Sequence, residues 1–106
     1  MLNSKHRSFL RSMAHSLPDL IHVGKEGITP NLIVQLKDAL KSRELVKGKV
    51  QQNAEEDVKS IAESLAISGG AEIISIIGNK FVLYKRNHTN PVIELPTTKV
   101  VRRIRG

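Results

Sequence analysis

The segment Gly24-Lys25-Glu26-Gly27 carries the most specific chemical signal in the sequence. It joins a short apolar run to a predicted helix start, at which Thr29 can act as the N-cap. Glycines let backbone N–H groups approach a ligand closely, and a helix N-terminus favours negative charge. Lys25 adds a full positive charge, whereas Glu26 would repel a phosphate unless its carboxylate points away. The pattern predicts a loop that binds the phosphate backbone of a nucleic acid, and a simple turn is the alternative.

Catalysis has little support in the rest of the chain. The loop is not a Walker A motif, because Ile28 and Thr29 follow Gly27 in place of Lys and Ser or Thr. There is no cysteine and no G-x-S-x-G motif, so neither a thiolate nor a nucleophile elbow is present. The four histidines have no partner at metal-ligand spacing. We therefore expect no enzymatic reaction, no metal, no cofactor and no small-molecule substrate.

Positive charge is concentrated at the two ends of the sequence. The net charge is +7, and residues 1–18 carry +3, residues 19–79 carry −2 and residues 80–106 carry +6. If both ends fold onto one side, their field recruits a polyanion such as RNA; solubility alone is the alternative. The candidate cations for this surface are Lys5, Arg7, Arg11, Lys85 and Arg86.

Aromatic residues are too few for recognition by base stacking. The sequence holds two phenylalanines, one tyrosine and no tryptophan. Phe9 lies on the apolar face of a predicted helix and belongs to the core. Tyr84 ends a predicted strand just before two cations, so it either stacks on a base or completes the core. Many cations with few stacking groups favour recognition of shape and phosphate over base sequence.

Apolar residues at helical spacing mark the segments that would position these groups. The predicted helices cover residues 4–17, 30–42 and 58–68. Asn3 or Ser4 can cap the first helix, and Pro18 ends it. Asn53 followed by Glu56 resembles a capping box for the third helix, which a glycine pair closes.

Short apolar and alternating runs predict the strands, which cover residues 20–23, 45–51, 72–77 and 80–84. In the second run Val46, Gly48 and Val50 share one face, while lysines occupy the other. The dipeptide Gly78-Asn79 predicts a tight antiparallel hairpin between the last two strands. The order α-β-α-β-α-β-β predicts an α/β (α+β) two-layer fold with a four-stranded mixed sheet, in which one β-α-β crossover makes a parallel pair.

Several short motifs resemble the CRM domain (chloroplast RNA splicing and ribosome maturation) in its stand-alone bacterial, YhbY-like form. They are Lys5-His6-Arg7, Leu10-Arg11, Ala14-His15, Leu17, Val23-Gly24-Lys25, Gly27-Ile28-Thr29, Ala39-Leu40, Glu44-Leu45-Val46-Lys47, Ile77-Gly78 and Val82-Leu83-Tyr84-Lys85. The resemblance covers residues 1–96 and leaves 97–106 as a basic C-terminal tail. Gly48 departs from it, because the family usually has an apolar β-branched residue there, so we expect a weaker or bulged second strand.

The resemblance implies a fold similar to the C-terminal domain of translation initiation factor 3. It also implies an RNA-binding protein associated with precursors of the large ribosomal subunit, with the GxxG loop and the cations of the first helix on the RNA. We expect a cytoplasmic monomer with no membrane span, since no apolar run reaches the required ~18 residues. The alternatives are a factor for messenger RNA, small RNA or translation initiation, and a protein-binding module for an acidic partner.

Overall fold

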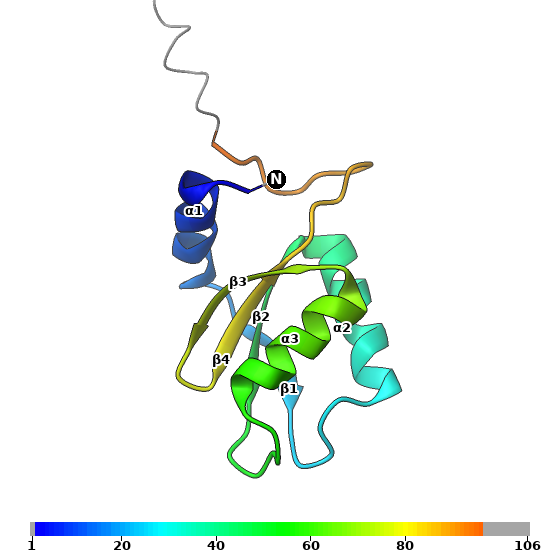
Figure 1. The fold of residues 1–106 in the computed structure, drawn as a ribbon. Coiled ribbons are helices and arrows are strands. Elements are labelled where there is room, and N and C mark those ends of the chain that lie inside the picture. The colour runs from blue at the N-terminus through cyan, green and yellow to red at the C-terminus, as the bar shows by residue number, and fades with distance from the viewer. Residues whose placement is uncertain (1, 97–106) are drawn as a thin grey trace, which may run out of the picture.

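The computed structural model describes residues 2–96 of the chain. Over these residues the elements follow one another as α1 (Ser4–Ala14), β1 (Asp19–Val23), α2 (Pro30–Arg43), β2 (Leu45–Val50), α3 (Val58–Gly69), β3 (Glu72–Ile77) and β4 (Lys80–Tyr84) (Figure 1). The predicted α-β-α-β-α-β-β order is confirmed. The predicted basic tail, residues 97–106, lies outside the described residues.

Within residues 2–96 the strands form one mixed sheet in the order β1-β2-β4-β3. β1 and β2 are parallel, whereas β4 is antiparallel to both β2 and β3. The crossover through α2 and the hairpin at Gly78-Asn79 are therefore both confirmed. The fold class is α+β, as the sequence predicted.

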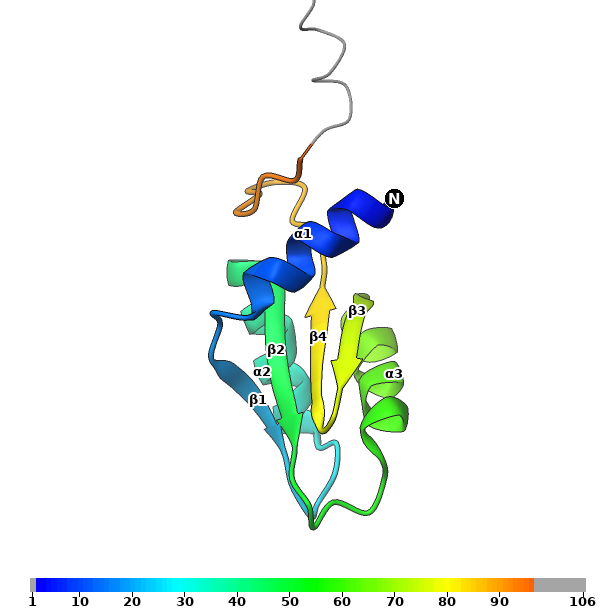
Figure 2. The ribbon, with the colours of Figure 1, turned by 90° about the vertical axis from the view of Figure 1, so that its left-hand side faces the viewer.

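The helices cover both faces of the sheet. Figure 2 shows α1 in front of the strands and α2 with α3 behind them. The expectation of two layers is wrong in this respect, because α1 packs on β2 and β3 from the opposite side. The cause is visible in β4, where Phe81 and Leu83 face one side, Val82 and Tyr84 face the other, and all four are buried. A strand that is apolar on both faces needs cover on both faces.

The larger core lies between the sheet and the pair α2 and α3, and its largest side chain is Phe81. Gly48 makes room for that ring: a Cβ atom at this position would lie 2.7 Å from Phe81 Cε1 and 2.9 Å from the carbonyl oxygen of Ile21. β2 is continuous through Gly48, and the register shift lies opposite it in β1, between Asp19 and Ile21. The irregularity that was expected in β2 is therefore found in β1.

The smaller core lies beneath α1. Its buried members are Leu10, Ala14, Leu45, Ile74, Val82, Tyr84 and Ile93. Ile93 comes from the segment that follows β4, so residues 85–96 are part of the fold although their sequence pattern is weak. At the end of this segment the carbonyl oxygen of Pro96 lies 2.9 Å from His6 Nε2 on α1.

Side-chain caps fix where α1 and α3 begin. Asn3 caps α1, since its Oδ1 accepts the His6 N–H at 2.8 Å. α1 ends at Ala14 rather than at residue 17, because the next three N–H groups bond to the third residue before them and tighten the chain. The predicted capping box of α3 is wrong: Asp57 is the N-cap, and its Oδ1 accepts the Ser60 N–H at 2.8 Å.

Glu44 anchors the segment after β4 to the rest of the fold. It joins α2 to β2 with φ +65°, and its side chain is fully buried. Its carboxylate accepts the N–H groups of Asn87 at 2.6 Å, Val92 at 2.8 Å and Ile93 at 2.6 Å. Burial acts to raise the pKa of Glu44, but these three hydrogen bonds and the charge of Arg86 outweigh it and lower the pKa. Glu44 is therefore a buried anion that holds a loop in place.

Candidate nucleic-acid interface

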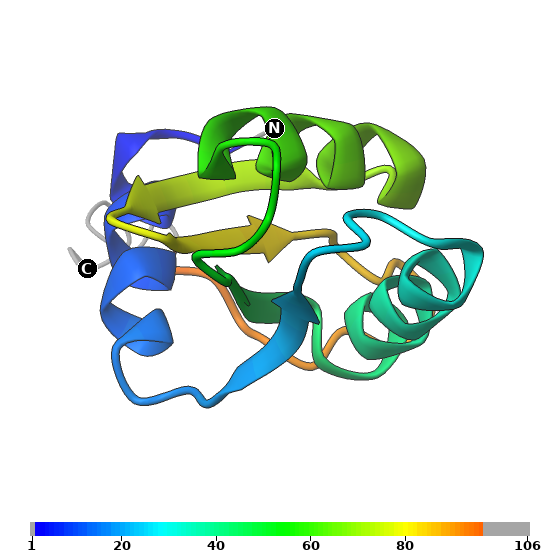
Figure 3. The same ribbon diagram turned by 90° about the horizontal axis from the view of Figure 1, so that it is seen from below.

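The GxxG segment is a tight turn at the end of the sheet where β1 and β2 finish (Figures 1 and 3). The Gly27 N–H donates to the Gly24 carbonyl oxygen at 3.0 Å, and Gly27 has φ +70°, which favours glycine. Lys25 and Glu26 at the tip are both exposed. Thr29 caps α2 as predicted, since its Oγ1 accepts the Leu32 N–H at 3.2 Å. The strand, turn and capped helix thus stand in the order that the sequence predicted.

The turn can donate backbone hydrogen bonds to a ligand. Within residues 2–96, the N–H groups of Lys25, Glu26 and Ile28 have no acceptor in the protein. The charge around them is mixed, because the β2–α3 loop at the same end carries the exposed acids Glu55, Glu56 and Asp57 (Figure 3). The turn therefore offers N–H donors and one cation to a phosphate, without a strongly positive field around it.

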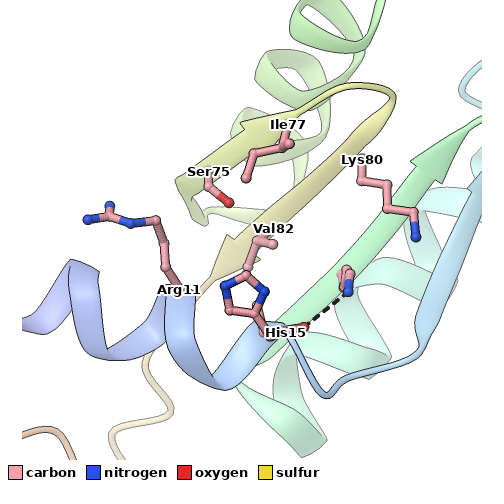
Figure 4. Close-up of a pocket in the computed structure, with 8 residues that line it drawn as sticks. Arg11, His15, Ser75, Ile77, Lys80 and Val82 are labelled. Atoms are coloured by element: carbon pink, nitrogen blue, oxygen red, sulfur yellow. Dashed lines mark hydrogen bonds between the residues drawn. The ribbon is translucent and has the colours of Figure 1, made fainter.

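A groove lies between the C-terminal half of α1 and the face of the sheet that α1 covers in part. Its floor includes Val82 and Ile77, and Figure 4 shows Arg11 and Lys80 at its two ends with His15 between them. Lys80 Nζ lies 3.4 Å from a carboxylate oxygen of Asp19, so its charge is partly neutralised. Arg11 is exposed and extends away from the groove floor, where it can reach an anion.

The lysine and arginine side chains on this face differ in whether they are already bonded to other groups of the protein. Lys47 Nζ donates to the carbonyl oxygens of Ala14 at 3.1 Å and Leu17 at 3.4 Å, so it satisfies the end of α1. Arg7 holds α1 against β3, with one guanidinium nitrogen 3.2 Å from Glu72 Oε1 and the other 2.6 Å from the Ile73 carbonyl oxygen. The predicted role of Arg7 in binding thus competes with a structural one.

Lys5 lies exposed on the first turn of α1. Its side chain forms no ion pair within the described residues. Of the predicted cations of α1, Lys5 and Arg11 are therefore the ones that the fold leaves available to an anion.

Tyr84 belongs to the core. Its side chain is 3% exposed and packs in the cluster beneath α1, so it presents no face to a nucleobase. Burial raises the pKa of its hydroxyl group. Of the two readings of the sequence, the structure supports the one in which Tyr84 completes the core. Because both faces of β4 are buried, Tyr84 cannot stack on a base. The local sequence did not show that both faces would be covered.

Lys85 and Arg86 lie at the other end of the sheet from the GxxG turn. β4 runs away from that turn, and these residues follow its last residue (Figures 1 and 2). They therefore do not extend the surface of the GxxG turn, although the segment that follows them contacts α1 through Pro96 and His6. They line a separate groove together with Lys37 and Lys41 of α2, which the sequence analysis missed. The signal was present, since Lys37 and Lys41 are one helical turn apart on an exposed face.

Residues 2–96 contain neither a membrane-spanning helix nor a cluster of metal ligands. No helix in this range combines the length and apolar composition that a membrane crossing requires. No cluster of three or more histidine, aspartate or glutamate side chains in the same range is placed to hold a metal ion.

Comparison with known proteins places the chain in a family. The model of the CRS1 / YhbY (CRM) domain matches residues 2–85, and the chain belongs to this family. The chain is 46% identical to the Bacillus subtilis protein YqeI, named a probable RNA-binding protein, over 91% of this chain and 100% of that protein. It is 30% identical to a Haemophilus influenzae protein named an RNA-binding protein, over 90% of this chain and 95% of the other.

A solved structure also resembles this one. The solution structure of a hypothetical Staphylococcus aureus protein, described there as a candidate for RNA binding, superposes with a TM-score of 0.74. It is 41% identical in sequence and covers 91% of this chain and 100% of that chain. The likeness extends over almost the whole chain, so the arrangement of the helices and the sheet is shared at the level of the fold.

Proposed function

We propose that this protein binds ribosomal RNA in precursors of the large ribosomal subunit and acts in the cytoplasm as an assembly factor. The observation that carries the proposal is the exposed GxxG turn, with unbonded N–H groups, between β1 and the capped start of α2. The membership of the CRM family and the relatives named RNA-binding proteins support RNA as the partner.

In this proposal the turn holds one backbone phosphate. The N–H groups of Lys25 and Glu26 donate to its oxygens, and Lys25 Nζ supplies the charge. Arg11 on α1 extends the contact along the RNA, and Lys5, at the start of α1 near the opposite end of the sheet, extends it farther. Glu26 turns its carboxylate to solvent, away from the phosphate. Because these are contacts to the backbone, they position RNA without reading its bases.

The aromatic residues are consistent with backbone recognition. Phe81 and Tyr84 are buried, and Phe9 packs partly against the smaller core. None of them forms an exposed stacking platform of the kind that single-stranded RNA readers use. Structured ribosomal RNA, which presents its phosphates in a fixed geometry, fits this surface better than an extended single strand.

The test is sedimentation of cell extract through sucrose gradients at low and moderate salt, with and without ribonuclease. We expect the protein to co-migrate with large-subunit precursors at low salt and to be released by salt or ribonuclease. Lys25→Gln should shift it toward the top of the gradient, whereas Lys59→Gln, an exposed lysine on α3, should not. Migration with small RNAs or initiation complexes would support the messenger-RNA alternative, and a complex that survives ribonuclease would support an acidic protein partner.

A further inference from the structure

The groove at the far end of the sheet holds the largest group of available cations in the described residues. Lys37, Lys41, Lys85 and Arg86 line it and are exposed, and none forms an ion pair with a described residue. At the GxxG end, by comparison, Lys25 is accompanied by the exposed acids Glu26, Glu55 and Glu56. This end of the molecule therefore carries more unneutralised charge than the GxxG end.

The acidic groups near the groove do not cancel this charge. The carboxylate of Glu44 lies beneath it but is fully buried and already accepts three N–H groups. The C-terminus of α3 carries partial negative charge, and Lys85 lies close enough to neutralise it. Gly70 caps this helix end, and a Cβ atom built on Gly70 would lie 3.5 Å from Lys85 Nζ. Arg86 is near enough to the Glu44 carboxylate to help lower its pKa, so Lys37 and Lys41 are the cations that keep their full charge for a ligand.

The walls of the groove are fixed by hydrogen bonds. Asn87 is held at its N–H by Glu44 and donates from Nδ2 to the Lys41 carbonyl oxygen at 3.0 Å. Its Oδ1 in turn accepts the N–H groups of Thr89 and Asn90, each at 3.0 Å. The segment that carries Arg86 is thus held in one position against α2, and a ligand meets a preformed site.

The chemistry of the lining indicates the ligand. Its polar groups are four cations, the Asn87 amide, the His88 imidazole and the Thr89 hydroxyl, and it contains no phenylalanine, tyrosine or tryptophan. Lys37 and Lys41 are separated by one helical turn, about 6 Å along the axis, so they can contact successive charges of a linear polyanion. This pattern suits the phosphate backbone of RNA.

The groove is too far from the GxxG turn to bind the same phosphates. The six residues of β2 separate the two ends by roughly 17 Å or more. That distance exceeds the Debye length of about 8 Å at physiological salt, so the two sites act as independent electrostatic surfaces. We propose that this groove is a second RNA-backbone site, and that the protein bridges two segments of RNA. This inference rests on the proposed function for the first site.

The experiment captures two RNAs with one protein. A biotinylated RNA hairpin from large-subunit ribosomal RNA is immobilised and saturated with protein, unbound protein is washed away, and a second, fluorescent hairpin is added at low salt. The wild type should capture the second hairpin. Lys37→Gln/Lys41→Gln should retain the first hairpin through the GxxG surface, and the captured fluorescence should fall at least about fivefold. The matched control Arg43→Gln/Lys59→Gln removes the same charge outside the groove and should capture as the wild type does.

The outcomes separate the two proposals. If the first hairpin does not retain the protein, the proposed function fails. If it does, bridging through the groove is refuted when the wild type fails to capture the second hairpin. It is refuted equally when Lys37→Gln/Lys41→Gln captures the second hairpin as well as the wild type does, which is the result that a dimer with two GxxG surfaces would give. Equal loss in the control would also overturn it. Capture of a fluorescent polyglutamate in preference to the hairpin, at matched charge, would overturn it in favour of an acidic protein.

Discussion

The buried carboxylate of Glu44 allows the most quantitative prediction. In Glu44→Gln the remaining oxygen can still accept the N–H groups of Val92 and Ile93, which bond to Oε1 in the wild type. The new amide group would then face the Asn87 N–H, donor against donor, in place of a 2.6 Å hydrogen bond. A hydrogen bond to a charged group contributes about 1.5–3 kcal/mol, and the two retained bonds lose their charge assistance. We expect the free energy of unfolding to fall by about 3 kcal/mol at pH 7.

The contribution of the Glu44 carboxylate to stability also depends on pH. The pKa of Glu44 is lowered below its ordinary value of 4.5 in the folded state, so the folded protein binds its proton less readily than the unfolded chain. The stability that the carboxylate contributes is complete above pH 4.5 and is lost as the pH falls through the folded-state pKa. Glu44→Gln should therefore have a smaller acid-induced loss of stability than the wild type.

The assay is urea denaturation followed by circular dichroism at pH 7 and at several values below pH 4.5. The control is Glu63→Gln, which removes the same charge from an exposed position on α3. We expect the control to stay within about 0.5 kcal/mol of the wild type. A loss below about 1 kcal/mol for Glu44→Gln, with an unchanged acid limb, would refute the role assigned to the carboxylate.

Other substitutions test the packing and the site. Gly48→Ala should destabilise by about 2 kcal/mol in the same urea assay, because its Cβ would collide with the Phe81 ring and a backbone oxygen, and Phe81→Leu in the same chain should recover part of the loss. Tyr84→Phe should leave the free energy of unfolding nearly unchanged and the RNA affinity within about twofold to threefold of the wild type, since the hydroxyl is buried without a partner among the described residues. A large loss of affinity in a filter-binding assay would contradict the placement of Tyr84 in the core. Lys25→Ala should weaken RNA binding with little change in the unfolding midpoint, and equal affinity at matched salt, with Lys59→Ala as the control, would remove the turn from the interface.

Local sequence was sufficient for most of the fold. Alternation in β2, helical spacing in α2 and the Gly78-Asn79 turn are properties of neighbouring residues, so they predicted these elements and their order. The N-cap at Thr29 was predictable for the same reason. The cap of α3 was not, because both Asn53 and Asp57 are good caps and the folded loop decides between them.

Features that depend on distant residues were not predictable from local patterns. The role of Glu44 depends on donors more than forty positions later in the chain, and nothing in the surrounding sequence marks it as buried. The separation of Lys85 from the GxxG turn follows from the direction of β4 in the sheet. The sequence predicted Arg7 to be free for RNA, but the fold brings β3 beside α1 and pairs Arg7 with Glu72. The local geometry of the GxxG turn was predicted well, whereas the distribution of charge around it was not.

The central claim is that RNA is held through its phosphates, and the salt dependence of affinity tests it most directly. Binding of wild-type protein to a large-subunit ribosomal RNA hairpin would be measured from about 50 to 200 mM salt. Each neutralised phosphate contributes roughly −0.9 to the slope of log K against log salt on a duplex, and roughly −0.7 on a single strand. With contacts from Lys5, Arg11 and Lys25, we predict a slope near −2 to −3, which Lys25→Ala reduces by about one. A slope near zero, with affinity retained, would contradict the account.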